Sequence, residues 1–168
     1  MLFHTDPLEI VDVYPPATTE HYSNDRLGFE HIYLHGTGGT DSAAWLSTTS
    51  KPPVSAHRLI RRNGQIVKIV DDRFVAFTQG FGHMEGIHFN LNRIALSIEL
   101  ENLNDGKQPF TQAQLISCAK QVVEWHGLYG TLPILYHHYV ENDKPFCPRN
   151  FPRFIFDRYY FQELKRYL

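Results

Sequence analysis

Residues 137 to 148 bring two adjacent histidines, His137 and His138, together with Lys144 and Cys147 in one short stretch. Imidazole nitrogen and thiolate sulfur are ligands of zinc, and a catalytic zinc keeps three protein ligands and leaves a fourth position open. The stretch therefore predicts about half of a zinc site, with a further ligand supplied from elsewhere in the chain. The competing interpretation is a surface loop with a solvated lysine and a buried thiol.

The two histidines cannot both face a metal if they continue the apolar run that begins at Ile134 as an extended strand. Successive side chains of a strand point to opposite faces of the sheet. Only one of His137 and His138 would then face a metal held from one side, and the sequence leaves the choice open.

The two cysteines of the chain, Cys118 and Cys147, are too few for a disulfide framework. Cys118 lies inside a helical pattern of apolar residues, where a free thiol behaves as a small hydrophobic side chain. Cys147 lies in a loop between Phe146 and Pro148. We therefore predict that Cys118 belongs to the core and that Cys147 is functional.

A second candidate ligand, His35, ends an extended run over residues 29–35 that stops at a glycine-rich turn. His31 would share its face of the strand, but four residues of strand separate the two by about 13 Å, so they cannot bind one zinc together. The turn lacks the Gly-Lys-Ser/Thr ending of a phosphate loop. His57 lies in another extended run and is interpreted as a hydrogen-bonded structural histidine.

Glu99 stands in the clearest alternating pattern of the chain, residues 93–102, in which apolar residues alternate with small or polar ones. A carboxylate near the functional end of a strand can act as a general base. The same alternation is also typical of a half-buried edge strand with its polar residues in solvent. The pattern alone leaves both interpretations open.

The remaining patterns alternate between strand and helix and predict a single α/β domain with a mixed central sheet flanked by helices. Residues 1–28 are expected to form an N-terminal arm, with a short strand near 10–13, and residues 29–168 the catalytic domain. The other expected elements are a helix at 41–49, a hairpin of strands 54–62 and 65–70 around Asn63-Gly64, a loop at 71–89 with a helical turn at 74–79, a helix at 111–126 opened by a capping box, a strand at 134–140 and a helix at 154–167.

The composition narrows the class of partner. The 168 residues carry a formal charge of −2 and ten histidines, which gives no indication of nucleic acid or of an anionic membrane as a partner. No run of 18 apolar residues and no signal-peptide pattern is present. We expect a monomer that is cytoplasmic at synthesis and acts there or after release by another system, unless a leader was removed.

An ordered set of motifs resembles the zinc-dependent N-acetylmuramoyl-L-alanine amidases of type 2, a family that includes short phage endolysins, the anhydromuropeptide amidases and the peptidoglycan recognition proteins. The resemblance covers roughly residues 29–160. The motifs that carry it are His35-Gly36-Thr37-Gly38-Gly39, the run from Val54 to Ile60 followed by Asn63-Gly64-Gln65-Ile66, Asn92, Ser97-Ile98-Glu99-Leu100-Glu101-Asn102, and the stretch from His137 to Cys147-Pro148.

This resemblance implies a zinc ion held by His35, His137 and Cys147, with His138 as the rival for the second position. It implies Glu99 as the acidic catalytic residue that accepts a proton from water, and Lys144 as the cation that stabilises the oxyanion. The implied reaction is hydrolysis of the amide between N-acetylmuramic acid and L-alanine in peptidoglycan or a muropeptide. Thr37 matches a threonine two residues after the first zinc histidine.

Three departures from the family pattern stand out. Lys144 lies three residues before Cys147, whereas the lysine of the family is usually two before the third ligand. Ala56 stands where some endolysins have a tyrosine. Residues 77–80, Phe-Thr-Gln-Gly, replace a frequent Trp-His-Ala-Gly turn.

Arg58, Arg61, Asn92 and Arg149 are candidate donors to the stem peptide. The alternatives are a recognition module that binds peptidoglycan without cutting it, and a zinc hydrolase of another amide.

Overall fold

The computed structural model describes residues 9–84, 87–140 and 146–167, and its central feature is a six-stranded sheet in the order β1-β5-β4-β9-β3-β10. Four adjacent strands, β4, β9, β3 and β10, run parallel to one another, while β5 pairs antiparallel with β4 and β1 pairs parallel with β5. The sheet is therefore mixed, as predicted. Its strands are β1 (Ile10–Asp12), β3 (His31–Gly36), β4 (Arg58–Ile60), β5 (Ile66–Lys68), β9 (Ala95–Leu100) and β10 (Ile134–Tyr136).

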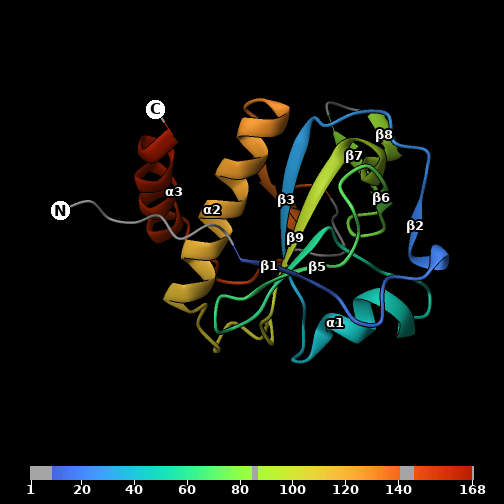
Figure 1. The fold of residues 1–168 in the computed structure, drawn as a ribbon, viewed down its shortest axis with the longest axis horizontal. Helices are drawn as coiled ribbons and strands as arrows, with labels where there is room; N and C mark the ends of the chain where they lie inside the picture. Colours follow the sequence, from blue (N-terminus) through green and yellow to red (C-terminus); the bar gives the residue numbers. More distant parts are fainter. Residues whose placement is uncertain (1–8, 85–86, 141–145, 168) are drawn as a thin grey trace.

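Two long helices cover one face of this sheet. The helix α2 (Gln112–Tyr129) packs on the strands and α3 (Arg153–Tyr167) packs on α2, so both helices lie on the same side in Figure 1. The α2 helix begins at the predicted capping box, in which the Thr111 hydroxyl accepts from the backbone N–H of Gln114 and the Gln114 side chain accepts from that of Thr111. Trp125 and Cys118 of this helix are fully buried, which confirms Cys118 as a core residue.

The opposite face carries the shorter elements, as Figure 1 shows on the right and below the sheet. They are α1 (Ser42–Ala44), continued by a π-helix at Trp45–Thr49, the pair β2 (Tyr22–Ser23) and β6 (Val75–Ala76), and the hairpin of β7 (Phe81–Met84) and β8 (Ile87–Asn90). The alternation of side chains divides the strands between the two faces. Residues such as Leu34 and Ile98 join the core under α2, and Leu59 joins the core on the α1 side.

The strand β9 is buried along its whole length, with β4 on one side and β3 on the other. The half-buried edge strand that its alternation allowed is therefore wrong. Its polar residues point to the face opposite α2, where other elements cover them. Glu99 and Ser97 thus lie inside the protein, with exposed fractions of 7% and 0%.

Three predicted elements differ in the structure. The loop expected at 71–89 contains β6, β7 and the start of β8, and β7 and β8 pair as an antiparallel hairpin. The strand expected at 134–140 ends at Tyr136, and His137–Tyr139 form a 3₁₀ turn because the backbone N–H of His138 donates to the carbonyl of Cys147 instead of continuing the sheet. The helical turn expected at 74–79 is absent from the described residues. Its place is taken by β6, because the backbone amides that follow bond to side chains of distant residues.

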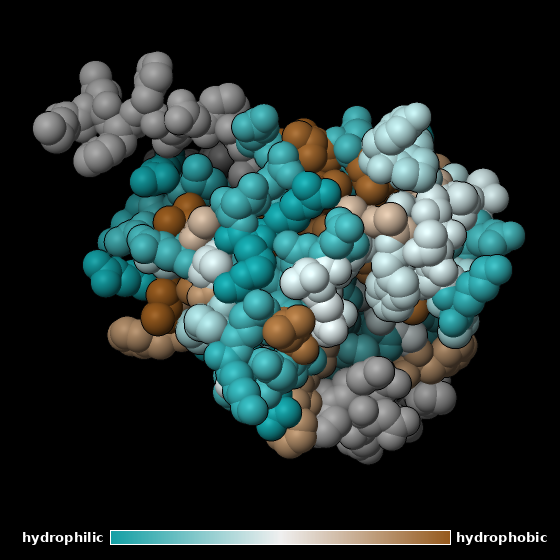
Figure 2. Space-filling model, turned by 90° about the horizontal axis from the view of Figure 1, so that it is seen from below, coloured by the Kyte–Doolittle hydropathy of each residue, from teal (hydrophilic) through white to brown (hydrophobic). Residues whose placement is uncertain are grey.

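The surface seen from below Figure 1 is mostly hydrophilic, with small, separated hydrophobic spots (Figure 2). Within the described part of the chain, no helix combines the length and apolar character needed to cross a membrane.

Candidate active site

The order of the parallel strands brings the predicted site residues together. His35 of β3 and Glu99 of β9 are direct register partners on neighbouring strands, so their side chains project from the same face. On the other side of β3, β10 ends at Tyr136, and His137 follows immediately. Three neighbouring strands thus deliver Glu99, His35 and His137 side by side at their carboxyl ends.

Cys147 completes a cluster of ligand atoms with the two histidines. One nitrogen of His35, one nitrogen of His137 and the sulfur of Cys147 all lie within 4.8 Å of one another, and all three residues are buried. The Nδ1 atoms of the two histidines are 3.1 Å apart, and the cysteine sulfur lies 3.5 Å from the backbone nitrogen of Gly36. Two imidazoles and one thiol at this spacing match the donor types of a zinc site with one open position.

His138 is turned away from this cluster. Its Nδ1 lies 3.0 Å from the carbonyl oxygen of Cys147, and its ring stacks on Tyr136 with the centroids 5.5 Å apart. The structure therefore places His137, and not His138, beside His35. His138 instead fixes the backbone of the cysteine that follows nine residues later.

Burial sets the protonation of His35. The loss of solvent lowers the pKa of its imidazole well below the usual value, the neighbouring His137 lowers it further, and a hydrogen bond with the Gln79 side chain acts in the opposite direction. The imidazole is therefore neutral near pH 7. A neutral imidazole offers the lone pair that a metal ligand requires.

These residues line a cleft of about 590 Å³. Glu99 lies in its wall together with the three ligand residues, and Trp45, Pro52, Pro53 and Phe77 form an apolar part of the lining. Trp45 is 43% exposed and so presents part of its ring to a ligand. The volume lies in the range of pockets for small ligands, roughly 300–1,000 Å³.

Two further residues shape the walls without offering free groups. The Thr37 hydroxyl donates to the carbonyl of Gly39 and accepts from the backbone N–H of Asn102, which closes the turn after β3. The side-chain oxygen of Asn92 accepts from three consecutive backbone amides, those of Thr78, Gln79 and Gly80, at 3.0–3.1 Å. The Asn92 side chain thereby holds residues 78–80 at the edge of the cleft.

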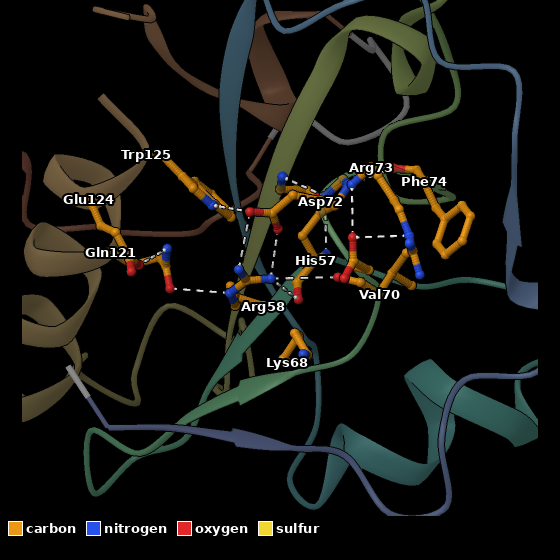
Figure 3. Close-up of polar contacts among 12 residues, drawn as sticks. His57, Arg58, Lys68, Val70, Asp72, Arg73, Phe74, Gln121, Glu124 and Trp125 are labelled. Atoms are coloured by element: carbon orange, nitrogen blue, oxygen red, sulfur yellow. Dashed lines mark hydrogen bonds and ion pairs between the residues drawn. The ribbon is translucent and has the colours of Figure 1, made fainter. Parts of the chain in front are cut away.

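Arg58, a candidate donor to substrate, lies instead at the amino end of β4. Its Nη1 is 2.8 Å from Asp72, and its guanidinium also donates to Gln121 and to the carbonyl of His57. Asp72 accepts further hydrogen bonds from Trp125 and from Tyr129. Figure 3 shows this ion pair between the sheet and α2, and each of the three side-chain nitrogens of Arg58 donates to a group of the protein.

His57 belongs to the same end of the sheet. It is 1% exposed, its Nδ1 lies 3.0 Å from the Ser97 hydroxyl and its Nε2 lies 3.1 Å from the carbonyl oxygen of Phe74. Both ring nitrogens are therefore occupied, as predicted for a structural histidine.

The other predicted residues fall outside the cleft or outside the described part of the chain. Arg61 donates to the Gln65 side chain in the β4–β5 turn, and Arg149 stacks on Phe146. Lys144 lies outside the described residues.

Sequence reasoning missed Gln79, which is buried in the cleft beside His35. The signal was the replaced turn at 77–80, where a glutamine stands in the place of the alanine of the family.

The model of the N-acetylmuramoyl-L-alanine amidase family matches residues 25–150, which include strands β3 to β10, the lining of the cleft and the cluster of ligand atoms. The chain belongs to this family. The match confirms the resemblance found in the motifs, and it includes His35, Glu99, His137 and Cys147.

A curated relative is similar to part of this chain. The chain is 44% identical over 64 residues to the 1,6-anhydro-N-acetylmuramyl-L-alanine amidase AmpD of Haemophilus influenzae. The matched segment is 38% of this chain and spans only a third, 33%, of that relative.

Solved structures share the fold at lower identity. A crystal structure of AmpD superposes with a TM-score of 0.76 at 23% identity, covering 90% of this chain and 94% of that one. The amidase LysC of Clostridium intestinale superposes with a TM-score of 0.69 at 22% identity, over 89% and 95% of the two chains. These similarities confirm the α/β fold with a mixed sheet and flanking helices.

Proposed function

We propose that the chain is a zinc-dependent amidase that hydrolyses the bond between N-acetylmuramic acid and L-alanine of peptidoglycan or its fragments. The observation that carries the proposal is the cluster of His35, His137 and Cys147, whose ligand atoms lie within 4.8 Å of one another in a cleft that also contains Glu99. Membership of the amidase family supports the choice of reaction.

The three clustered residues would hold the metal through two imidazole nitrogens and one thiolate. When bound, zinc polarises the scissile carbonyl and lowers the pKa of water so that a nucleophile forms at neutral pH. The protein contributes the geometry. It keeps His35 neutral by burial and presents all three ligands from the ends of β3 and β10 and from the loop that follows.

Glu99 would take the proton from the attacking water and deliver it to the departing amine. Its position supports this role, because it is the register partner of His35 on the adjacent strand and lines the same cleft. A general base must lie within reach of both the water and the leaving group, and the cleft offers no nearer carboxylate among its described lining residues. Lys144 is proposed, from the resemblance alone, as the cation that stabilises the oxyanion.

The cleft lining supports a substrate with both a sugar and a peptide part. Trp45 and Phe77 offer aromatic surface, and Asn104 and Thr78 bring polar side chains to the same cleft. A structure of similar fold, the amidase AmiD of E. coli, was solved with anhydro-N-acetylmuramic acid-L-Ala-D-gamma-Glu-L-Lys, over 75% of this chain at a TM-score of 0.58. We propose a ligand of this class for the present cleft.

The test is digestion of purified peptidoglycan by the purified protein, before and after chelation and after addition of zinc, with the products identified by mass. We expect stem peptides that begin with L-alanine to be released from unbroken glycan, only when zinc is present. A chelated protein that keeps full activity would contradict the metal role. Release of a product cut at another amide would contradict the proposed substrate.

The same assay separates two kinds of substrate. Intact peptidoglycan and a soluble anhydromuropeptide are supplied in parallel, because the curated relative is named for the anhydro substrate while several proteins of similar fold are endolysins. A faster reaction on intact wall favours a lytic enzyme, and a faster reaction on the fragment favours recycling. Stoichiometric zinc with wall binding but no cleavage would instead favour a recognition module.

A further inference from the structure

Gln79 occupies a rigid position at the edge of the cleft. The side-chain oxygen of Asn92 accepts from the backbone N–H of Gln79 at 3.0 Å and from those of both neighbouring residues at 3.1 Å. The preceding Phe77 donates its N–H to the Ser55 hydroxyl at 2.8 Å. Four consecutive backbone amides are thus fixed by buried side chains, which sets the direction in which the Gln79 side chain leaves the backbone.

That side chain points into the metal cluster. Gln79 is 2% exposed and lines the same cleft as His35, and its side chain acts to raise the pKa of the His35 imidazole. The Oε1 atom of Gln79 and the Nε2 atom of His35 are both buried, and neither has a hydrogen-bond partner among the residues that the structure describes. Gln79 therefore offers an unused acceptor in the same cleft wall as a ring nitrogen of His35 that lacks a partner.

The position of the proton on the neutral His35 imidazole agrees with this pairing. The Nδ1 of His35 lies 3.1 Å from the Nδ1 of His137, so it is the nitrogen that faces the other ligands. To bind a metal this nitrogen must keep its lone pair, and the single proton of a neutral imidazole then resides on Nε2. A buried Nε2–H needs an acceptor, and metal-bound histidines commonly donate their second N–H to a carbonyl or carboxylate that fixes the ring.

We propose that Gln79 is a positioning residue for the metal: its amide oxygen accepts the Nε2–H of His35 and holds that imidazole in the tautomer and orientation that bind zinc. The proposal rests on the zinc site proposed above. It assigns a role to the residue that replaces alanine in the family turn, and it explains why a polar side chain is buried there.

The test compares the zinc affinity of the wild-type protein with that of Gln79→Leu, which keeps the volume and removes the acceptor. The affinity is measured by competition with a chromophoric chelator, so the readout is independent of catalysis. We expect a loss of about 10–100-fold, the usual cost of losing an outer partner of a metal ligand. Gln79→Glu, which restores an acceptor, is expected to recover the affinity.

Gln121→Leu is the matched control. Gln121 is also fully buried, but it belongs to α2, on the face of the sheet opposite the cleft, where its side chain accepts from Arg58 and donates to Glu124. This variant is expected to lose stability and keep the wild-type zinc affinity. Equal zinc affinity in Gln79→Leu and wild type would overturn the proposal, and so would equal losses in Gln79→Leu and the control.

A measurement on the unmodified protein serves if a variant fails to fold. Nitrogen-15 NMR of the zinc-loaded wild type should show the proton of His35 on Nε2, protected from exchange and close to the Gln79 side chain. A proton on Nδ1, or an Nε2–H that exchanges freely with solvent, would overturn the proposal. If the wild type binds no zinc in the competition assay, the zinc site itself fails, and this outcome is distinct from the failure of Gln79.

Discussion

Each end of the parallel strands contains a buried histidine, and these two histidines differ in the groups that surround their ring nitrogens. At the amino end, His57 is enclosed by Ser97, the Phe74 carbonyl and Arg26, and both of its ring nitrogens are occupied. At the carboxyl end, His35 turns one nitrogen toward a second imidazole and a thiol. Both are at least 99% buried, so burial alone does not separate a structural histidine from a ligand. The neighbours of each ring nitrogen do.

The same contrast holds for the charged groups. Arg58 and Asp72 neutralise each other at the amino end, and the remaining donors of Arg58 bond to Gln121 and to backbone carbonyls. The carboxyl end places Glu99 in the wall of a cleft that is open to a ligand. The charged groups at the amino end are therefore paired within the fold, whereas the carboxyl end borders the cleft to which we assign the proposed chemistry. This division yields predictions that separate activity from stability.

The largest effect on activity is expected from Cys147→Ala. It removes one of three ligands, so zinc retention should fail, and activity should fall by more than about 100-fold, since even the loss of an outer partner of a metal ligand costs 10–100-fold. The fold should persist, because Cys147 lies between β10 and α3 and belongs to none of the strands and helices of the core. Metal content and hydrolysis of peptidoglycan are measured together with circular dichroism. A metal-free variant with full activity would refute the ligand role.

Glu99→Gln should retain zinc and lose catalysis. The amide keeps the shape of the side chain but cannot accept the proton, and the loss of a general base costs about 10²–10⁴-fold in rate. We measure kcat and zinc content of the same preparation. A variant with a normal kcat would move the role of base to another group, whereas loss of the metal as well would make Glu99 part of the metal support.

Asp72→Ala should have the reverse effect, with stability lost and zinc affinity kept. It leaves the buried Arg58 unpaired, which costs roughly 3–5 kcal/mol in the free energy of unfolding. Denaturant unfolding of the metal-free protein measures this loss. The double variant Arg58→Met with Asp72→Leu is the control, because apolar replacement of a whole buried pair is often neutral or stabilising. A loss of zinc affinity in Asp72→Ala would contradict the separation of the two ends.

The sequence predicted much of this arrangement because several of its signals are local. The capping box at Thr111, the Asn63-Gly64 hairpin and the alternation around Glu99 all depend on neighbours within a few residues. The order β9-β3-β10, which sets Glu99, His35 and His137 side by side, depends on pairing between segments that are up to a hundred residues apart. The motif resemblance supplied that information, and local periodicity did not.

The errors arose where a group distant in the sequence takes up the backbone hydrogen bonds of the predicted element. The amides of residues 78–80 bond to Asn92, so the helical turn expected nearby does not form. The carbonyl of Cys147 accepts from His138 and ends the strand expected to run to 140. Gln79 was missed because a loop residue has no periodicity and because His35, which lines the same cleft, is 44 residues away in the sequence.

Acidification tests the buried histidine of the amino end. Burial, followed by the charge of Arg26, lowers the pKa of His57 well below its usual value, so the folded state keeps this imidazole neutral. The unfolded chain takes up a proton below about pH 6.5, so stability is fully present above that pH and falls as the pH decreases toward the folded value. His57→Gln should flatten this dependence in metal-free protein. An unchanged slope would assign the effect to other groups.

The smallest expected effect tests whether the two ends are independent. The Ser97 hydroxyl lies 3.0 Å from Nδ1 of His57 and 2.7 Å from the Thr78 hydroxyl, so it links the amino-end histidine to the segment that carries Gln79. Ser97→Ala should cost about 1–2 kcal/mol in the free energy of unfolding, the usual result of leaving buried polar partners unsatisfied. If zinc affinity stays constant, Asn92 alone fixes Gln79. A fall in zinc affinity that tracks Gln79→Leu would show that packing at the amino end also sets the geometry of the metal ligands.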